Sequence, residues 1–195
     1  MLIEFPSERT IEDYVWHCLQ TIGECPIGGD TPDIYLRQKA IPGYGVTDII
    51  KIRTEFDSIQ VTIIELKNTQ LCADHVIQLC RYMAGAKKIA ERYQARVQDC
   101  PEIAICGELA GPFDRKKSEL MFMMNELESV EFFDLSLSMD SGFSAKRLGK
   151  GWHYINAKTL PNKGLTREIS DCVRFDLEAT FGAAKKVVSI NGGDK

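Results

Sequence analysis

The sequence predicts an α/β fold in which a mixed central sheet is flanked by helices. Three observations favour this class: a helical pattern opens the chain, three extended stretches follow it, and a second helical pattern precedes a fourth extended stretch. The chain has 195 residues, 44% of them hydrophobic, which is enough to build a core. Since no repeat or low-complexity linker divides it, we expect residues 1–195 to form a single domain.

The first expected element is a helix over about residues 8–22. Ser7 is a suitable N-cap residue for this helix. Apolar side chains then recur at helical spacing, at Ile11, Tyr14, Val15, Cys18, Leu19 and Ile22. The proline and glycine residues of segment 26–32 predict that a loop follows the helix.

A meander of three strands is expected after the loop. Residues 34–40 form one extended stretch, and residues 46–53 and 59–66 are rich in β-branched side chains. The polar segment 54–58 supplies a turn between the second and third strands. Strands joined by such a short turn pair in antiparallel order.

A second, longer helix is expected after the meander. Helical spacing predicts it over about residues 72–93, and Pro101 then opens a strand at 102–108. The rest of the chain, about 108–195, is expected to form an α+β extension. Its elements would be a helix capped by Asp114 that runs through the Met-rich segment 120–128, strands at 130–139 and 151–157, and a helix over about 166–181.

Composition argues against secreted and membrane-spanning proteins. The chain begins without a basic segment followed by an apolar run, and it has no stretch of about 20 apolar residues. Its seven cysteines include no CxxC pair, which is typical of proteins with reduced thiols. We therefore expect a cytoplasmic protein that does not bind membranes.

Basic residues gather in two places although the net charge is −4. The last fifty residues carry ten Lys and Arg against five Asp and Glu. Within and just after the long helix, cations recur at Arg81, Lys87, Lys88, Arg92 and Arg96. Clustered cations can bind phosphates even on an acidic protein. A solvated helix face is the alternative interpretation of the same pattern.

Charged residues at the end of the third expected strand are candidates for catalysis. Glu65 and Lys67 are two residues apart, so their side chains project on the same side, about 6.6 Å apart along the strand. The preceding hairpin turn brings Asp48 alongside Glu65. Carboxylates without histidine or cysteine suit Mg²⁺ or Mn²⁺, and Lys67 can orient a metal-bound water. The pattern predicts hydrolysis of phosphodiesters.

Three motifs in a fixed order carry a family resemblance: Asp48, Glu65-Leu66-Lys67 and Gln78-x-x-x-Tyr82. This set resembles the PD-(D/E)XK nuclease superfamily, and its last motif is similar to the QxxxY signature of the RecB-type branch. The resemblance covers roughly residues 8–107 and includes the lead-in Arg37-Gln38. It implies a restriction-endonuclease-like αβββαβ core.

The resemblance also implies roles for these residues. The implied metal ligands are Asp48, Glu65, the backbone carbonyl of Leu66 and, from the first helix, Glu12, with Glu8 as the second choice. Lys67 would serve the attacking water, and Gln78 with Tyr82 would shape the site beside the nucleic acid.

One position departs from the family pattern. Thr47 replaces the proline that gives the motif its name, while a literal Pro32-Asp33 pair stands earlier in the chain. Because Asp33 precedes an additional extended segment and lies far from Glu65 in sequence, we interpret it as a loop acid.

We therefore expect a Mg²⁺- or Mn²⁺-dependent nuclease that hydrolyses DNA in repair, recombination, restriction or a mobile-element role, with RNA as an alternative substrate. Its nucleic-acid contacts would include Arg81, Lys87 and Lys88. The competing hypothesis is a catalytically silent protein that uses the nuclease fold for nucleic-acid binding or assembly, as a homodimer or as a subunit of a larger complex. The replacement at Thr47 and the unassigned extension motivate this hypothesis.

Overall fold

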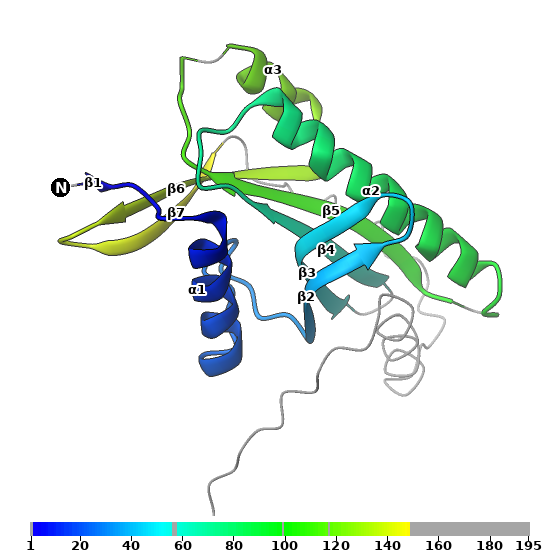
Figure 1. Ribbon diagram of the computed structural model, residues 1–195. Helices are drawn as coiled ribbons and strands as arrows, with labels where there is room; N and C mark the ends of the chain where they lie inside the picture. Colours follow the sequence, from blue (N-terminus) through cyan, green and yellow to red (C-terminus); the bar gives the residue numbers. More distant parts are fainter. Residues whose placement is uncertain (1, 56–57, 99, 117, 149–195) are drawn as a thin grey trace, which may run out of the picture.

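The protein is an α/β structure with one mixed sheet and helices on both faces (Figure 1). The computed structural model describes residues 2–55, 58–98, 100–116 and 118–148. The strand and the helix expected at 151–157 and 166–181 lie outside these residues.

The first helix and the three-strand meander agree with the sequence prediction. Helix α1 (Glu8–Thr21) is capped by Ser7, whose Oγ accepts a hydrogen bond from the Thr10 amide over 3.1 Å. The meander consists of β2 (Ile34–Ile41), β3 (Gly45–Glu55) and β4 (Ser58–Leu66). Its neighbouring strands pair in antiparallel order, as expected.

The long helix and the fourth expected strand are also confirmed. Helix α2 (Ala73–Gln94) leads into β5 (Glu102–Gly111), which pairs with β4 in parallel. The helix thus forms the crossover that a parallel pair requires. The strand expected at 130–139 is β6 (Val130–Ser138), which pairs with β5 in parallel.

Three details of the outer region differ from the prediction. Helix α3 (Ser118–Glu126) begins three residues later than a helix capped by Asp114 would, because Asp114 instead accepts a hydrogen bond from the Lys116 amide in a turn. Strand β7 (Gly142–Leu148) was not predicted, since only Phe143 and Ala145 alternate with polar residues before the basic pair 146–147 interrupts the pattern. The two-residue β1 (Leu2–Ile3) was missed because it is too short to show a pattern.

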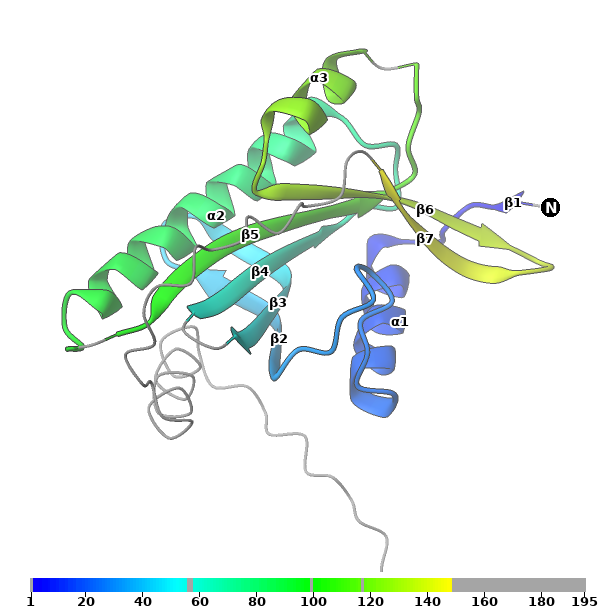
Figure 2. The same cartoon turned by 180° about the vertical axis from the view of Figure 1, so that it is seen from behind.

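The seven described strands form one sheet in the order β1-β6-β5-β4-β3-β2, with β7 paired to β6. The β6–β7 hairpin extends away from the meander together with β1, and the view from behind shows α1 beneath this extension (Figure 2). Asp48 lies in β3 and Glu65 in β4, and neither belongs to the part of the sheet formed by β1, β6 and β7.

The sheet has a hydrophobic core on each face. Neighbouring isoleucines alternate between the two: Ile63 packs in the core beneath α2, and Ile64 packs in the core beneath α1. Helix α2 contributes Leu79 to the first core, and α1 contributes Val15 to the second. Because both faces are covered, β4 is buried without interruption from Val61 to Leu66, although its first residues alternate between polar and apolar.

None of the helices within the described ranges has the length and apolar composition needed to cross a membrane. The six described cysteines are free thiols, in agreement with the expectation of reduced cysteines.

Candidate active site

The candidate active site lies where β3 separates from β4. The last regular pair between these strands joins Ile49 to Ile64, whereas β3 continues to pair with β2 as far as Gly45. Asp48 occupies the first position beyond that last pair. Its Oδ2 accepts a hydrogen bond from the Leu66 amide over 2.8 Å, so a side chain ties the strands together where the regular pairing stops.

Glu65 and Lys67 lie on the same side of the chain, as their spacing predicted. Lys67 Nζ donates to Glu65 Oε1 over 2.8 Å, and both side chains are buried. The second carboxylate oxygen, Glu65 Oε2, is buried without a hydrogen-bond partner among the described residues. A buried oxygen without a partner costs about 1–3 kcal/mol, and more when it is charged. A bound cation would remove this cost.

The two acids influence each other's ionisation. Burial raises the pKa of Asp48 to about 6, although the Leu66 amide and Lys67 act in the opposite direction. Burial and then the negative charge of Asp48 raise the pKa of Glu65 to about 7. Two carboxyl groups with raised pKa values at one point are typical of sites that bind cations or transfer protons.

Helix α1 supplies two further acids to this region. Glu8 Oε2 lies 3.6 Å from Lys67 Nζ, and its side chain is 46% exposed. The negative charges of Glu12 and Glu8 contribute to the raised pKa of Asp48, so both acids lie close to it. Glu12, the first-choice ligand, already accepts hydrogen bonds at both oxygens, from Arg37 Nε over 2.5 Å and from Gln38 Nε2 over 3.0 Å. Glu8 is the less constrained of the two.

Arg37 and Gln38 form a clamp on α1, because both side chains donate hydrogen bonds to Glu12. The family resemblance includes both residues but implies no role for them. Gln38 has a φ of 47° and is the only non-glycine residue with positive φ in the described part of the chain. It stands opposite Asp48, where the regular β2–β3 pairing is interrupted. A conformation of this kind costs on the order of 1 kcal/mol or more. The Gln38–Glu12 hydrogen bond offsets part of that cost.

Gln78 and Tyr82 interact directly, as their four-residue spacing suggested. Gln78 Nε2 donates to the Tyr82 hydroxyl over 2.8 Å, and the Tyr82 side chain is buried. The Tyr82 ring packs against Gly45, where an added Cβ would lie 2.7 Å from ring atom Cε1. The motif on α2 thus contacts the start of β3, three residues before Asp48.

The cations predicted to bind nucleic acid are exposed on α2. The Arg81 guanidinium lies 5.5 Å from the centre of the Tyr82 ring, and Lys88 Nζ lies 5.4 Å from the centre of the Tyr44 ring. Lys87 is exposed beside them. Arg81 therefore borders the glutamine-tyrosine pair, and Lys88 continues the positive charge along the helix.

Asp33 and Thr47, the two residues that raised a question about the family motif, both have structural roles. Asp33 lies at the other end of the meander, where its Oδ2 accepts from the Thr54 amide over 2.7 Å, in agreement with its interpretation as a loop acid. Thr47 is fully buried, and its hydroxyl donates to the Lys39 carbonyl over 3.3 Å. The threonine thus takes part in the β2–β3 pairing that supports Asp48.

The arrangement can hold a cation through oxygen atoms only. Within the described ranges, no group of three or more His, Cys, Asp or Glu side chains is already poised to hold a metal ion. An ion would therefore complete its shell with backbone oxygen, water or substrate phosphate, as Mg²⁺ usually does. No family model, no curated protein and no solved structure matches this chain.

Proposed function

We propose that the protein is a Mg²⁺- or Mn²⁺-dependent nuclease that hydrolyses phosphodiester bonds of DNA on a restriction-endonuclease-like core. One observation carries the proposal: Asp48, Glu65 and Lys67 converge where two strands separate, and one buried oxygen of Glu65 has no partner among the described residues. A phosphodiester hydrolase needs this combination of carboxylates and a cation.

The residues fit a divalent metal ion. The donors are hard oxygen atoms, which Mg²⁺ and Mn²⁺ prefer. Burial raises the pKa of Asp48 to about 6, and burial together with the charge of Asp48 raises the pKa of Glu65 to about 7, so a bound cation would favour the ionised form of both acids. The proposed ligands are Asp48, Glu65, the backbone carbonyl of Leu66 and one acid of α1, Glu8 or Glu12. When bound, the ion would supply Lewis acidity and an activated water.

The remaining side chains would position the substrate and balance its charge. Lys67 Nζ is held between Glu65 Oε1, at 2.8 Å, and Glu8 Oε2, at 3.6 Å, so the position of its ammonium group is fixed beside the acids. There it would donate a hydrogen bond to a phosphate oxygen and stabilise the charge that develops during attack. Gln78 and Tyr82 would form the wall that faces the sugar-phosphate backbone.

The exposed cations of α2 favour a polymeric substrate over a small phosphodiester. Arg81 and Lys88 stand seven residues apart, which is about 10 Å along a helix. One small phosphodiester cannot reach both positions together with the catalytic cluster, whereas consecutive phosphates of a strand can. We therefore place the DNA backbone along this part of α2.

Cleavage assays test the proposal. Plasmid and single-stranded DNA would be incubated with the full chain in Mg²⁺, Mn²⁺ or EDTA, using the variants Asp48→Asn and Lys67→Ala. A matched control exists in the chain, because the triplet 114–116 also reads Asp-x-Lys but lies in a turn before α3. The controls are therefore Asp114→Asn and Lys116→Ala.

We expect metal-dependent cleavage by the wild type and by both controls, and a loss of about a hundredfold or more in Asp48→Asn and Lys67→Ala. Cleavage at the wild-type rate in those two variants would refute the assignment. DNA binding without cleavage in any metal would instead identify the catalytically silent alternative, which the full engagement of Glu12 by Arg37 and Gln38 favours.

A further inference from the structure

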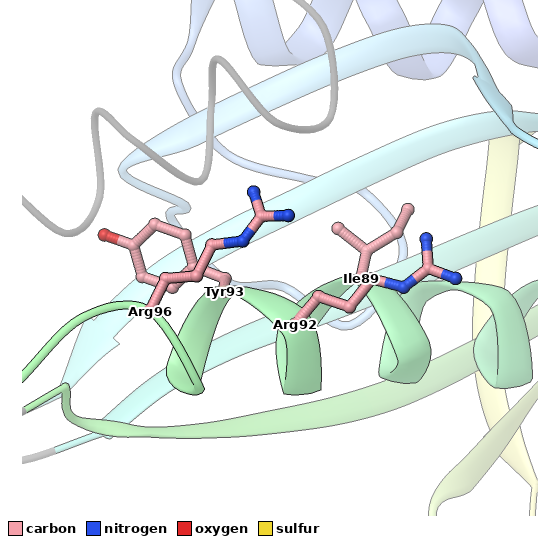
Figure 3. Close-up of a pocket in the computed structure, with 4 residues that line it drawn as sticks. All are labelled: Ile89, Arg92, Tyr93 and Arg96. Carbon is pink, nitrogen blue, oxygen red and sulfur yellow. The ribbon is translucent and has the colours of Figure 1, made fainter.

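A cavity lies near the carboxyl end of α2, away from the catalytic cluster. Its volume is about 230 Å³, and it is lined by Ile89, Arg92, Tyr93 and Arg96 (Figure 3). These positions recur at intervals of three and four residues, so one side of the helix and its C-terminal extension carries all four side chains. The described residues thus bring two cations, one aromatic ring and one aliphatic side chain to the cavity.

No intramolecular ion pair explains the presence of Arg92 and Arg96 in the part of the chain that the structure describes. Both are exposed, and neither forms an ion pair with a described residue. Arg92 lies in the last turn of α2, where a cation stabilises the helix dipole. This effect accounts for one charge at the helix end. It does not account for a second arginine past the helix end, nor for the shared cavity with Tyr93.

We propose that this cavity binds one unpaired nucleotide of a nucleic-acid strand. Arginine recognises phosphate through two parallel hydrogen bonds, and a tyrosine ring stacks on any base. In this site Arg92 and Arg96 bind the phosphate, while the base lies against Tyr93 and Ile89. A base in a duplex is already stacked and paired, so the ligand is a single strand or a frayed end.

The size of the cavity agrees with a single nucleotide. Pockets for complete small-molecule ligands usually measure about 300–1,000 Å³. A cavity of about 230 Å³ is smaller than that range and suits one unit of a longer chain, with the rest of the strand outside. This volume suits one nucleotide unit better than a complete dinucleotide cofactor.

The cavity lies on the same helix as the glutamine-tyrosine pair. Tyr82, Ile89 and Tyr93 are separated by seven and four residues and lie on the side of α2 that packs against the core, where Tyr82 is buried and Ile89 and Tyr93 are only partly buried. Eleven residues separate Tyr82 from Tyr93, which corresponds to about 16 Å of helix. A strand held in the cavity would reach the catalytic cluster after a few nucleotides. This inference rests on the proposed nuclease function for its biological meaning, but the binding itself does not require catalysis.

Binding of fluorescein-labelled (dT)₁₂ and of a 12-base-pair hairpin duplex, measured by fluorescence anisotropy in EDTA, tests the proposal without cleavage. The variants are Tyr93→Leu, its conservative counterpart Tyr93→Phe, and the pair Arg92→Gln with Arg96→Gln. The matched control removes two exposed cations elsewhere, through Arg115→Gln with Lys146→Gln. Circular dichroism and thermal unfolding report whether each variant folds.

We expect Tyr93→Leu to weaken (dT)₁₂ binding roughly tenfold, and Tyr93→Phe to bind within about twofold of the wild type. The double arginine variant should bind weakly and lower the salt slope by about 1.4, whereas the control pair changes binding less than about twofold. The hairpin should bind less tightly than (dT)₁₂ and show no dependence on Tyr93.

Three results would overturn the proposal: wild-type affinity in Tyr93→Leu, an equal loss in the control pair, or equal dependence of hairpin and (dT)₁₂ on Tyr93. If Tyr93→Leu does not fold, the affinity of the double arginine variant for (dT)₁₂ tests the proposal instead. Wild-type affinity in that variant would refute it. If binding depends on Tyr93 but no DNA is cleaved, the nuclease function is rejected and nucleotide binding in the cavity is retained. If DNA is cleaved but binding does not depend on Tyr93, only nucleotide binding in the cavity is rejected.

Discussion

Asp48 and Leu66 are joined by a hydrogen bond in which the Leu66 amide donates to the Asp48 carboxylate over 2.8 Å. The bond lies just past the last regular β3–β4 pair, so a side chain replaces the next backbone contact. As a result the Asp48 carboxylate is fixed beside Glu65, whose pKa it helps to raise. The interruption in the sheet therefore creates the charge density of the site.

Replacing Glu65 by glutamine is expected to stabilise the metal-free protein at high pH. Folding raises the pKa of Glu65 from 4.5 to about 7. Between these values the unfolded chain has released the proton that the folded protein keeps, so the free energy of unfolding falls as pH rises. Glu65→Gln removes this loss, which is roughly 1–3 kcal/mol at pH 8.

Urea unfolding of the wild type and Glu65→Gln at pH 5 and pH 8 in EDTA measures this difference. The pKa of Glu108 is also raised by burial, although Lys51 opposes the shift, and it gives a pH dependence of the same sign. This contribution is common to both proteins and cancels in the comparison. Equal pH dependence in both proteins would show that Glu65 does not carry a folding penalty.

Addition of Mn²⁺ should reverse the order of stability. An ion that binds only the folded protein stabilises it by about 2.7 kcal/mol at one hundred times its dissociation constant. Thermal unfolding should show this gain in the wild type and in the control Asp114→Asn, but not in Glu65→Gln. The gain should be larger at pH 8 than at pH 6, because the metal competes with protons for Asp48 and Glu65. A gain that persists in Glu65→Gln would place the ion elsewhere.

A separate prediction concerns Lys51, which is 1% exposed in the core beneath α1. Its Nζ donates to Asp30 Oδ1 over 2.6 Å and to Glu108 Oε1 over 2.9 Å, while Glu108 Oε2 is buried without a partner among the described residues. Lys51→Met leaves the Glu108 charge uncompensated, so it should lower the free energy of unfolding by about 3–5 kcal/mol.

A double-mutant cycle identifies the cause of that loss. The combination of Lys51→Met with Glu108→Leu removes both buried charges and should recover most of the stability, because apolar replacements of buried ion pairs are often close to neutral. Chemical denaturation of the two single variants and the double variant supplies the coupling energy. Simple addition of the two single losses would show that packing, rather than charge, governs this region.

The sequence was sufficient for the elements that depend on local spacing. Alternation along β4 placed Glu65 and Lys67 on one side, and the length of the β3–β4 hairpin placed Asp48 beside them. The four-residue interval predicted the contact of Gln78 with Tyr82. These relationships follow from helix and strand periodicity, so they do not require knowledge of the tertiary structure.

Other features depend on contacts that no local pattern records. The clamp of Arg37 and Gln38 on Glu12 needs both the packing of α1 and a positive φ at a residue other than glycine. Lys51 has the sequence environment of an ordinary strand lysine, and its partner Glu108 is 57 residues away. Long-range pairing of this kind is set by the topology of the sheet, which spacing alone does not determine.

The contact between Gly45 and Tyr82 gives a final prediction about how α2 controls the site. Gly45 has a φ of 127°, and a Cβ there would lie 2.7 Å from the Tyr82 ring. Gly45→Ala should therefore displace the ring and break its hydrogen bond with Gln78, in addition to straining the backbone. Gly43 also has a positive φ, 81°, but a Cβ there would meet nothing within 4 Å.

Gly43→Ala is thus a control that carries backbone strain without the steric clash. Urea unfolding should show a loss of about 1 kcal/mol for Gly43→Ala and a loss larger by roughly 1–3 kcal/mol for Gly45→Ala. DNA cleavage under conditions where both variants are folded should fall only in Gly45→Ala, because the Gln78–Tyr82 wall is displaced in that variant alone. Equal cleavage by the two variants would mean that Tyr82 packs against the meander without shaping the active site.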